Sequence, residues 1–116
     1  MDHPLEDPDL AHDVEVLREW AERTPEIQRV ILFGSRVLGR ARPSSDLDVS
    51  VVHEPAPGDA RGSTSADAER RGWLADLQPR MQLRLDLWSH LAPSDARKVH
   101  AGIEAGSLVI YDGVAA

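Results

Sequence analysis

The chain has 116 residues, a formal net charge of −7 at pH 7 and no cysteine. This length is typical of one domain, so we expect a single domain over residues 1–116. The absence of cysteine excludes disulfides and thiolate zinc sites, and the acidic balance argues against broad binding to DNA or RNA, which depends on Lys and Arg. The sequence has no long apolar run, and its acidic N-terminus is unlike a secretory signal, which predicts a cytoplasmic protein with no membrane association.

The N-terminal part predicts a helix followed by a buried strand. Apolar residues recur at helical spacing between Pro8 and Arg23, with Asp7 or Asp9 placed to cap the start: Leu10, Val14, Leu17 and Ala21. Thr24-Pro25 then ends the helix. The consecutive apolar residues within Ile27 to Phe33 predict a short strand that ends at Gly34.

The middle of the chain predicts a second strand with one polar face. Ser35 to Arg42 is typical of a helical turn or short helix, and residues 43–45 of a loop. After the loop, three apolar residues alternate with three polar ones, which is the period of a strand: Leu47, Val49 and Val51 against Asp46, Asp48 and Ser50. The two aspartates are therefore expected on the same face.

The remaining elements complete a small α/β fold. A Pro- and Gly-rich loop over residues 53–65 precedes a helix that Thr64 and Asp67 would open as a capping box and Pro79 would end. Alternation over Met81 to Trp88 predicts a third strand. A last helix near Pro93 to Ala105, ended by Gly106, leads to a strand over residues 107–111. The predicted class is α/β, a small mixed sheet with flanking helices.

Gly34-Ser35 is a candidate phosphate site. Glycine lets a ligand approach the backbone closely, and Ser35 adds a hydroxyl and an N–H at the start of the next turn. The same pair also suits a plain strand-to-helix turn with a serine cap. The dipeptide by itself leaves both interpretations open.

Asp46, Asp48 and Asp86 are candidate metal ligands. Two residues apart on a strand, Asp46 and Asp48 have Cα atoms about 7 Å apart, so their carboxylates can converge on a divalent cation. Asp86 lies on the polar face of another predicted strand. Crowded carboxylates raise one another's pKa unless a cation removes the repulsion. The alternative is that all three are solvated, with Asp86 paired to Arg84.

The combination of these motifs resembles a known signature. Gly34-Ser35, ten further residues, then Asp46-x-Asp48 opening a strand, and later Asp86 on another strand, is similar to the DNA polymerase β-like nucleotidyltransferase superfamily. Within it, the chain resembles the minimal nucleotidyltransferases, the antitoxin half of HEPN/MNT toxin–antitoxin pairs. The resemblance extends from the leading helix to the C-terminal "GIEAGSLVIYDG" and implies a palm-like nucleotidyltransferase fold.

The resemblance implies a set of roles. Gly34 and Ser35 would hold nucleotide phosphates, Asp46 and Asp48 would bind Mg²⁺, and Asp86 would complete a second metal site and help to activate the incoming hydroxyl. Two such cations stabilise the attacking and leaving oxygens of an in-line displacement. Arg36 is a candidate for the triphosphate, although it also suits a structural ion pair.

The implied reaction is transfer of AMP from ATP to a hydroxyl, on a tyrosine of a cognate HEPN ribonuclease toxin. Two alternatives stay open: transfer to a small molecule such as an aminoglycoside, and an idle site in an antitoxin that acts by binding alone. Template-directed polymerisation is disfavoured by the acidic charge. Structural or surface roles are predicted for the remaining histidines and tryptophans of interest: His53, His90, His100, Trp73 and Trp88.

Overall fold

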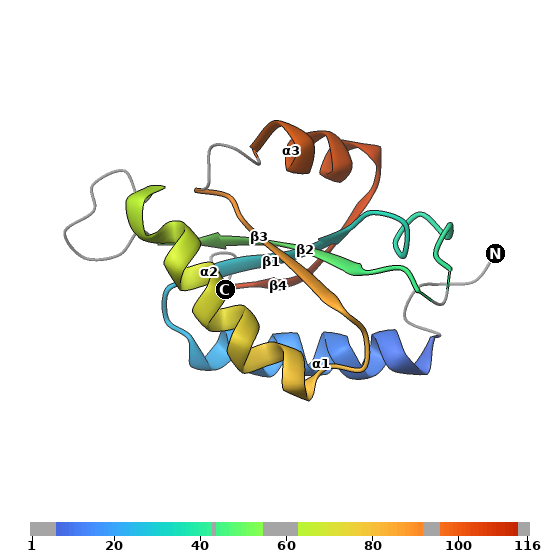
Figure 1. Cartoon of the computed structure of the whole chain (residues 1–116), viewed down its shortest axis with the longest axis horizontal. Helices are drawn as coiled ribbons and strands as arrows, with labels where there is room; N and C mark the ends of the chain where they lie inside the picture. Colours follow the sequence, from blue (N-terminus) through green and yellow to red (C-terminus); the bar gives the residue numbers. More distant parts are fainter. Residues whose placement is uncertain (1–6, 43, 55–62, 92–95, 114–116) are drawn as a thin grey trace.

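The computed structural model describes residues 7–42, 44–54, 63–91 and 96–113, with the side chains of 63–67 and 96 left aside. These ranges contain four strands, β1 (Ile27–Phe33), β2 (Leu47–His53), β3 (Leu85–Ser89) and β4 (Ser107–Asp112), in the spatial order β3-β2-β1-β4. β1 is antiparallel to both β2 and β4, whereas β2 and β3 are parallel. The predicted α/β class with a mixed sheet is therefore confirmed (Figure 1).

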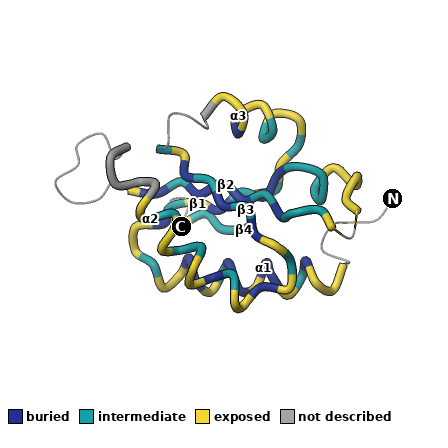
Figure 2. Tube along the Cα trace, viewed as in Figure 1, coloured by how far each residue is buried: buried dark blue, intermediate teal, exposed yellow. Residues whose placement is uncertain are grey.

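The helices cover the two faces of the sheet unequally. α1 (Pro8–Arg23) and α2 (Ser63–Leu77) lie together on one face, and α3 (Ala96–Ala105) lies on the other (Figure 1). Figure 2 shows that the buried positions lie mainly between the sheet and α1, while α3 is largely exposed. The face towards α1 and α2 therefore contains the main hydrophobic core, which includes Leu17, Val30, Leu32, Val49 and Leu87.

The first helix begins and ends where the sequence predicts. The Asp7 carboxylate accepts a hydrogen bond from the backbone N–H of Asp9, and Pro8 occupies the first turn, where its missing N–H is not needed. At the other end, the backbone N–H of Thr24 bonds to the carbonyl of Ala21. The apolar stripe of α1 is buried, including Leu10, Val14 and Leu17.

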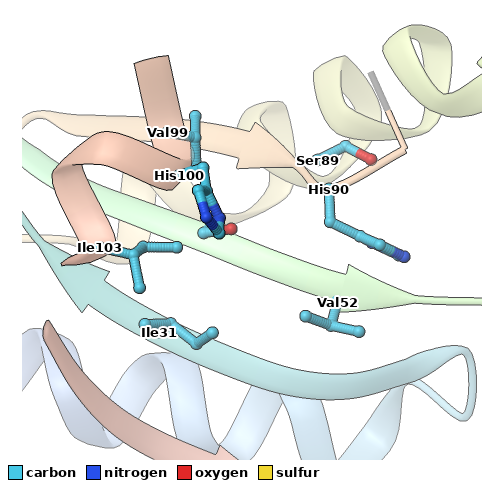
Figure 3. Close-up of a pocket in the computed structure, with 8 residues that line it drawn as sticks. Ile31, Val52, Ser89, His90, Val99, His100 and Ile103 are labelled. Carbon is cyan, nitrogen blue, oxygen red and sulfur yellow. The ribbon is translucent and has the colours of Figure 1, made fainter. Parts of the chain in front are cut away.

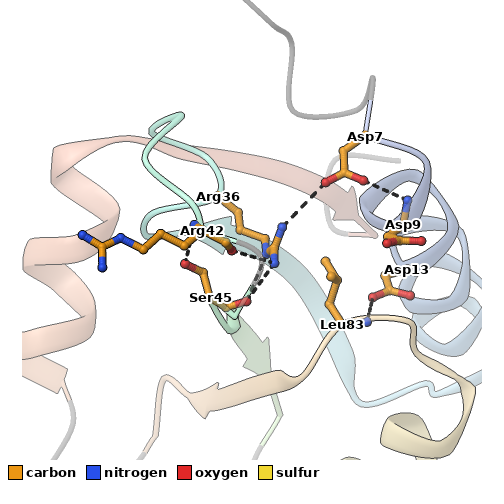
Figure 4. Close-up of polar contacts among 7 residues, drawn as sticks. All are labelled: Asp7, Asp9, Asp13, Arg36, Arg42, Ser45 and Leu83. Atoms are coloured by element: carbon orange, nitrogen blue, oxygen red, sulfur yellow. Dashed lines mark hydrogen bonds and ion pairs between the residues drawn. The ribbon is translucent and has the colours of Figure 1, made fainter.

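The third strand is shorter than predicted, because polar side chains bind the backbone before it. The strand was expected from Met81, but β3 begins at Leu85 after a 3₁₀ turn, Gln78–Arg80. Asp13, fully buried on α1, accepts hydrogen bonds from the backbone N–H groups of Gln82 and Leu83 at 2.7 and 2.8 Å (Figure 4). The Gln78 amide binds the Leu83 carbonyl and the Leu85 N–H. Backbone groups bound in this way are not available to a neighbouring strand.

The other predicted boundaries agree with the structure, differ from it in detail or lie outside the described residues. The stretch after Gly34 is a single helical turn rather than a helix, with the N–H groups of Val37 and Leu38 bonded to the Gly34 carbonyl, both at 3.1 Å. The loop predicted over residues 53–65 is shorter, because β2 extends to His53 and α2 begins at Ser63. Thr64 therefore lies within the helix and not at its cap, and residues 55–62 lie outside the description. None of the helices in the described ranges is long and apolar enough to cross a membrane.

Replacing Asp13 with alanine should lower the free energy of unfolding by about 3 kcal/mol, because two backbone N–H groups would lose a fully buried acceptor. Chemical denaturation monitored by circular dichroism would measure the change. Glu22→Ala, at an exposed position of the same helix, is the matched control and should change stability by less than about 0.5 kcal/mol. Equal losses in the two variants would contradict the bridging role of Asp13.

Candidate active site

Gly34 brings the end of β1 against the Asp48 carboxylate. Its φ of +83° lies in the left-handed region, where glycine is favoured. A Cβ atom at this position would overlap the Asp48 side chain, so the close approach also requires glycine. The backbone of Gly34 and Ser35 is consequently placed beside a carboxylate that is only partly buried.

The strand register brings Asp48 and Asp86 together. Asp48 pairs with Phe33 of β1 on one side and with Asp86 of β3 on the other. Since β2 and β3 are parallel and the two residues are direct partners, their side chains project from the same face of the sheet. This is the face that α3 only partly covers (Figure 1).

The electrostatics of Asp48 reflect this crowding. The pKa of Asp48 is raised from 3.8 to about 6, mainly by burial and then, in order of importance, by the charge of Asp86, a side-chain hydrogen bond with Asp86 and the charge of Asp46. The indole of Trp88 opposes the rise. The Asp48 carboxyl group therefore binds a proton more readily than an isolated aspartate does.

Asp46 lies nearby but is not part of the close pair. Its carboxylate is 42% exposed and lies 3.9 Å from the guanidinium of Arg84, which is itself 84% exposed. Arg84 therefore approaches Asp46, and not Asp86 as the structural alternative proposed. Over the described ranges, no three His, Asp or Glu side chains are already arranged to hold a metal ion.

Trp88 and Lys98 border the carboxylates. Trp88 follows Asp86 by two residues on the same face of β3 and pairs with Ser50 in the register. Its indole N–H is buried and lowers the pKa of Asp48, although no hydrogen bond of good geometry joins it to a described residue. The ammonium of Lys98, on α3, lies 5.4 Å from the centre of the indole ring. A buried donor held this loosely beside the acidic pair is suited to a ligand oxygen.

Arg36 holds the loop that leads to β2. Its guanidinium donates to the carbonyl oxygens of Ser45 and Arg42 and lies 3.6 Å from the Asp7 carboxylate, and its side chain is only 8% exposed (Figure 4). These contacts connect the N-terminus of α1 to the loop between β1 and β2. The structure thus gives Arg36 the structural contacts that the sequence left as an alternative, and its contact with a nucleotide stays a prediction.

Comparisons with known proteins identify the family. A family model described as a nucleotidyltransferase domain matches residues 14–100, about three quarters of the chain. The chain belongs to the nucleotidyltransferase domain family. The match contains Gly34, Ser35 and all three candidate carboxylates. It confirms the resemblance drawn from these motifs and shows that the protein is a nucleotidyltransferase.

Solved structures share the fold at low sequence identity. The toxin–antitoxin MntA-HpeT, in a form in which two aspartates one residue apart are changed to glutamate, has a TM-score of 0.62 and 14% identity, covering 88% of this chain and 74% of that one. A protein from Sulfolobus solfataricus described as a nucleotidyltransferase has a TM-score of 0.57 and 17% identity, covering 97% and 90%.

A toxin–antitoxin structure with AMP-PNP has a TM-score of 0.53 and 18% identity, covering 90% of this chain and 73% of that one. No curated protein matches the sequence. At these identities, the similarity to solved structures establishes the fold.

The nucleotidyltransferase site fits a hard divalent cation. The candidate ligands are all carboxylate oxygens, which Mg²⁺ prefers. Asp48 and Asp86 are direct partners in the strand register, and a cation between them would relieve the repulsion that raises the pKa of Asp48. Asp46 would need to turn away from Arg84 to join them. The exposure of both side chains leaves room for this change.

Sequence analysis missed two neighbours of the candidate site. Trp88 was expected in the core or at an interface, and Lys98 was not given a role, although both border the acidic face. The two-residue spacing from Asp86 to Trp88 places both on one side of the strand and could have indicated the first of these. Nothing in the sequence indicates that α3 carries Lys98 over the indole ring.

In metal-free buffer, Asp48→Asn should stabilise the protein by about 1 kcal/mol above about pH 7, a value reduced for the partial exposure of the carboxylate. The folded state raises the pKa of Asp48 from 3.8 to about 6, so it binds this proton more tightly than the unfolded state does. Stability of the unmodified protein therefore falls as the pH rises through this window.

Denaturation at several pH values would test this dependence. The stability difference between Asp48→Asn and the unmodified protein should be absent below about pH 4 and complete above about pH 7. The control is Asp76→Asn, which changes an exposed aspartate of α2. A difference for Asp48→Asn that does not vary with pH would show that crowding does not control this carboxyl group.

Proposed function

We propose that this protein is a Mg²⁺-dependent enzyme that transfers AMP from ATP to a tyrosine hydroxyl of a cognate HEPN ribonuclease toxin and thereby acts as its antitoxin in the cytoplasm. The observation that carries the proposal is the juxtaposition of Gly34, Asp48 and Asp86 on one face of the sheet. Residues 1–116 would act as one nucleotidyltransferase domain.

Two structures that share the fold support the proposed toxin partner and the use of ATP. Both structures are toxin–antitoxin pairs, and one of them contains AMP-PNP, an ATP analogue. The altered aspartates of the MntA-HpeT structure have the same one-residue separation as Asp46 and Asp48. The proposed toxin partner and the use of ATP in this chain rest on this similarity.

The residues have distinct roles in the proposed reaction. Asp46, Asp48 and Asp86 would hold the cations, which supply positive charge to the phosphate oxygens when bound. The backbone N–H groups of Gly34 and Ser35 would bind the β- and γ-phosphates, because glycine permits their close approach. Arg36 would hold the loop that follows these groups through its bond to the Ser45 carbonyl, and its guanidinium would also contact the triphosphate.

The chemical step forms one bond and breaks one. The acceptor oxygen bonds to the α-phosphorus, and the bond from this phosphorus to the oxygen that bridges to the β-phosphate breaks. Pyrophosphate leaves with that bridging oxygen and its electron pair. The hydroxyl proton passes to the Asp86 carboxylate and then to water, which leaves the acceptor as an AMP ester.

Asp46→Asn and Asp48→Asn should each lower AMP transfer by roughly 100-fold or more, because each removes a charged oxygen from the metal site. Intact mass spectrometry of the protein encoded beside this one would detect the added AMP after incubation with this chain, ATP and Mg²⁺. Asp76→Asn is the control on an exposed part of α2 and should transfer normally.

The alternatives give different results in this experiment. Transfer that survives in Asp46→Asn or Asp48→Asn would reject the metal role. No added mass with the unmodified chain, while the two proteins still co-elute, would indicate an antitoxin that acts by binding alone. No added mass and no co-elution would direct the search to small-molecule hydroxyls such as those of aminoglycosides.

Gly34→Ala should abolish nucleotide binding and transfer, whereas Gly39→Ala should retain both. The two glycines have similar positive φ values, +83° and +72°, so an alanine is strained at both positions. Only at Gly34 would the new methyl group overlap Asp48, since nothing lies within 4 Å of a Cβ at Gly39. Titration calorimetry with ATP would compare the variants. Equal losses would show that backbone strain, and not the approach to Asp48, is responsible.

A further inference from the structure

A pocket lies beneath α3 on the same face of the sheet as the carboxylates. Its volume is about 210 Å³. Ile31 and Val52 form the floor on the strands, and Val99 and Ile103 form the roof on α3 (Figure 3). A flat ring between these aliphatic side chains would contact apolar atoms on both of its faces.

The pocket rim is polar. Ser50 lies on β2 and His90 follows β3. His100 borders the opening from α3 (Figure 3), where its side chain is 75% exposed and lies 3.0 Å from the Glu104 carboxylate. Hydroxyl and imidazole groups both donate and accept hydrogen bonds, which suits the edge of a nitrogen heterocycle. Partial burial lowers the pKa of His90, so this part of the rim presents a neutral ring at pH 7 and is less suited to a phosphate.

The size of the pocket limits its occupant. A cavity of roughly 150 Å³ holds benzene, and pockets for whole drug-sized ligands begin at roughly 300 Å³. The volume of about 210 Å³ lies between these values. It suits one fused ring system, with the rest of the ligand outside.

The distance from the acidic pair matches the length of a nucleotide. Ser50 and Val52 follow Asp48 by two and four residues on the same face, which places them about 7 and 13 Å along β2. A ribose between the α-phosphate and the base spans a gap of this order. The ring in the pocket can therefore belong to a molecule whose phosphate lies at Asp48.

The orientation of the proposed reaction is also compatible with a base in this pocket. Gly34 directly follows β1, Asp48 lies on β2 and Asp86 on β3, so a line through them runs across the sheet. With pyrophosphate on the Gly34 side, an in-line displacement places the acceptor on the Asp86 side. The ester bond to the nucleoside lies across this line, and the directions open to it include those along the strands. In one direction along β2 lies the pocket, and in the other lies the exposed Arg84.

We propose that the pocket beneath α3 binds the adenine ring of the nucleotide, between Ile31 and Val52 below and Val99 and Ile103 above. This inference rests on the proposed function, because it assigns the base of the ATP whose phosphates bind at Gly34 and Ser35. It makes α3 the element that selects the base, while the loop after β1 binds the phosphates common to all nucleotides.

A comparison of ATP with inorganic tripolyphosphate, both with Ca²⁺ to prevent turnover, would test the pocket by titration calorimetry. Ile103→Trp fills the pocket and should weaken ATP binding at least tenfold while leaving tripolyphosphate binding within about twofold. Ala101→Trp introduces the same side chain at an exposed position of α3 outside the pocket. This control should bind both ligands normally.

The other outcomes separate the two proposals. Unchanged ATP affinity in Ile103→Trp, or an equal loss for ATP and tripolyphosphate, would overturn the base pocket. If the unmodified chain binds neither ligand, the proposed function itself fails.

If Ile103→Trp does not fold, NMR on the unmodified chain provides a second test. Nuclear Overhauser effects should connect the adenine protons of bound ATP to the methyl groups of Val52, Val99 and Ile103. Contacts from adenine to other methyl groups only would overturn the assignment.

Discussion

The arrangement of the site depends on the register of three neighbouring strands. Asp48 lies between Phe33 of β1 and Asp86 of β3, and Gly34 follows Phe33 directly. A shift of one residue in either pairing would turn the aspartates towards the hydrophobic core, because side chains alternate between the faces of a sheet. The apolar residues that alternate with the aspartates, Leu47, Val49 and Leu87, are almost fully buried on the opposite face and stabilise this register. Core packing on one face thus determines the chemistry of the other.

The helices cover the two faces of the sheet unequally, so one face stabilises the fold and the other carries the candidate site. α1 and α2 bury one face with apolar contacts, and Asp13 of α1 also binds the backbone that leads into β3, so Asp86 is positioned from the core side. The opposite face carries crowded carboxylates, and burial and the charge of Asp86 raise the pKa of Asp48 there. A bound cation would relieve this crowding, so ligand binding is expected to stabilise the fold.

The sequence predicted those features that depend on local patterns. The boundaries of α1, β1 and the start of β2 follow from helical spacing, alternation and the caps at Asp7 and Thr24. The start of β3 was wrong by four residues, because Asp13 and Gln78 bind the backbone before Leu85, and Asp13 is distant in the sequence from the groups it binds. Likewise, the order of the strands, the contacts of Arg36 and the position of Lys98 over Trp88 depend on tertiary packing. Residue spacing does not encode these long-range contacts.

The proposed positions of the phosphates and the base leave one route for the acceptor. Pyrophosphate would lie at the Gly34 end, and the adenine would lie along β2 beneath α3. The acceptor hydroxyl would then approach over Asp86 on β3, which is an edge strand of the sheet. No strand of the described chain lies beyond that edge, so a partner protein could bring a side chain to Asp86 from there. A partner with a basic surface would be favoured by the net charge of −7, whereas a nucleic-acid primer would be repelled by it. The geometry and the charge thus both favour a protein acceptor presented across β3.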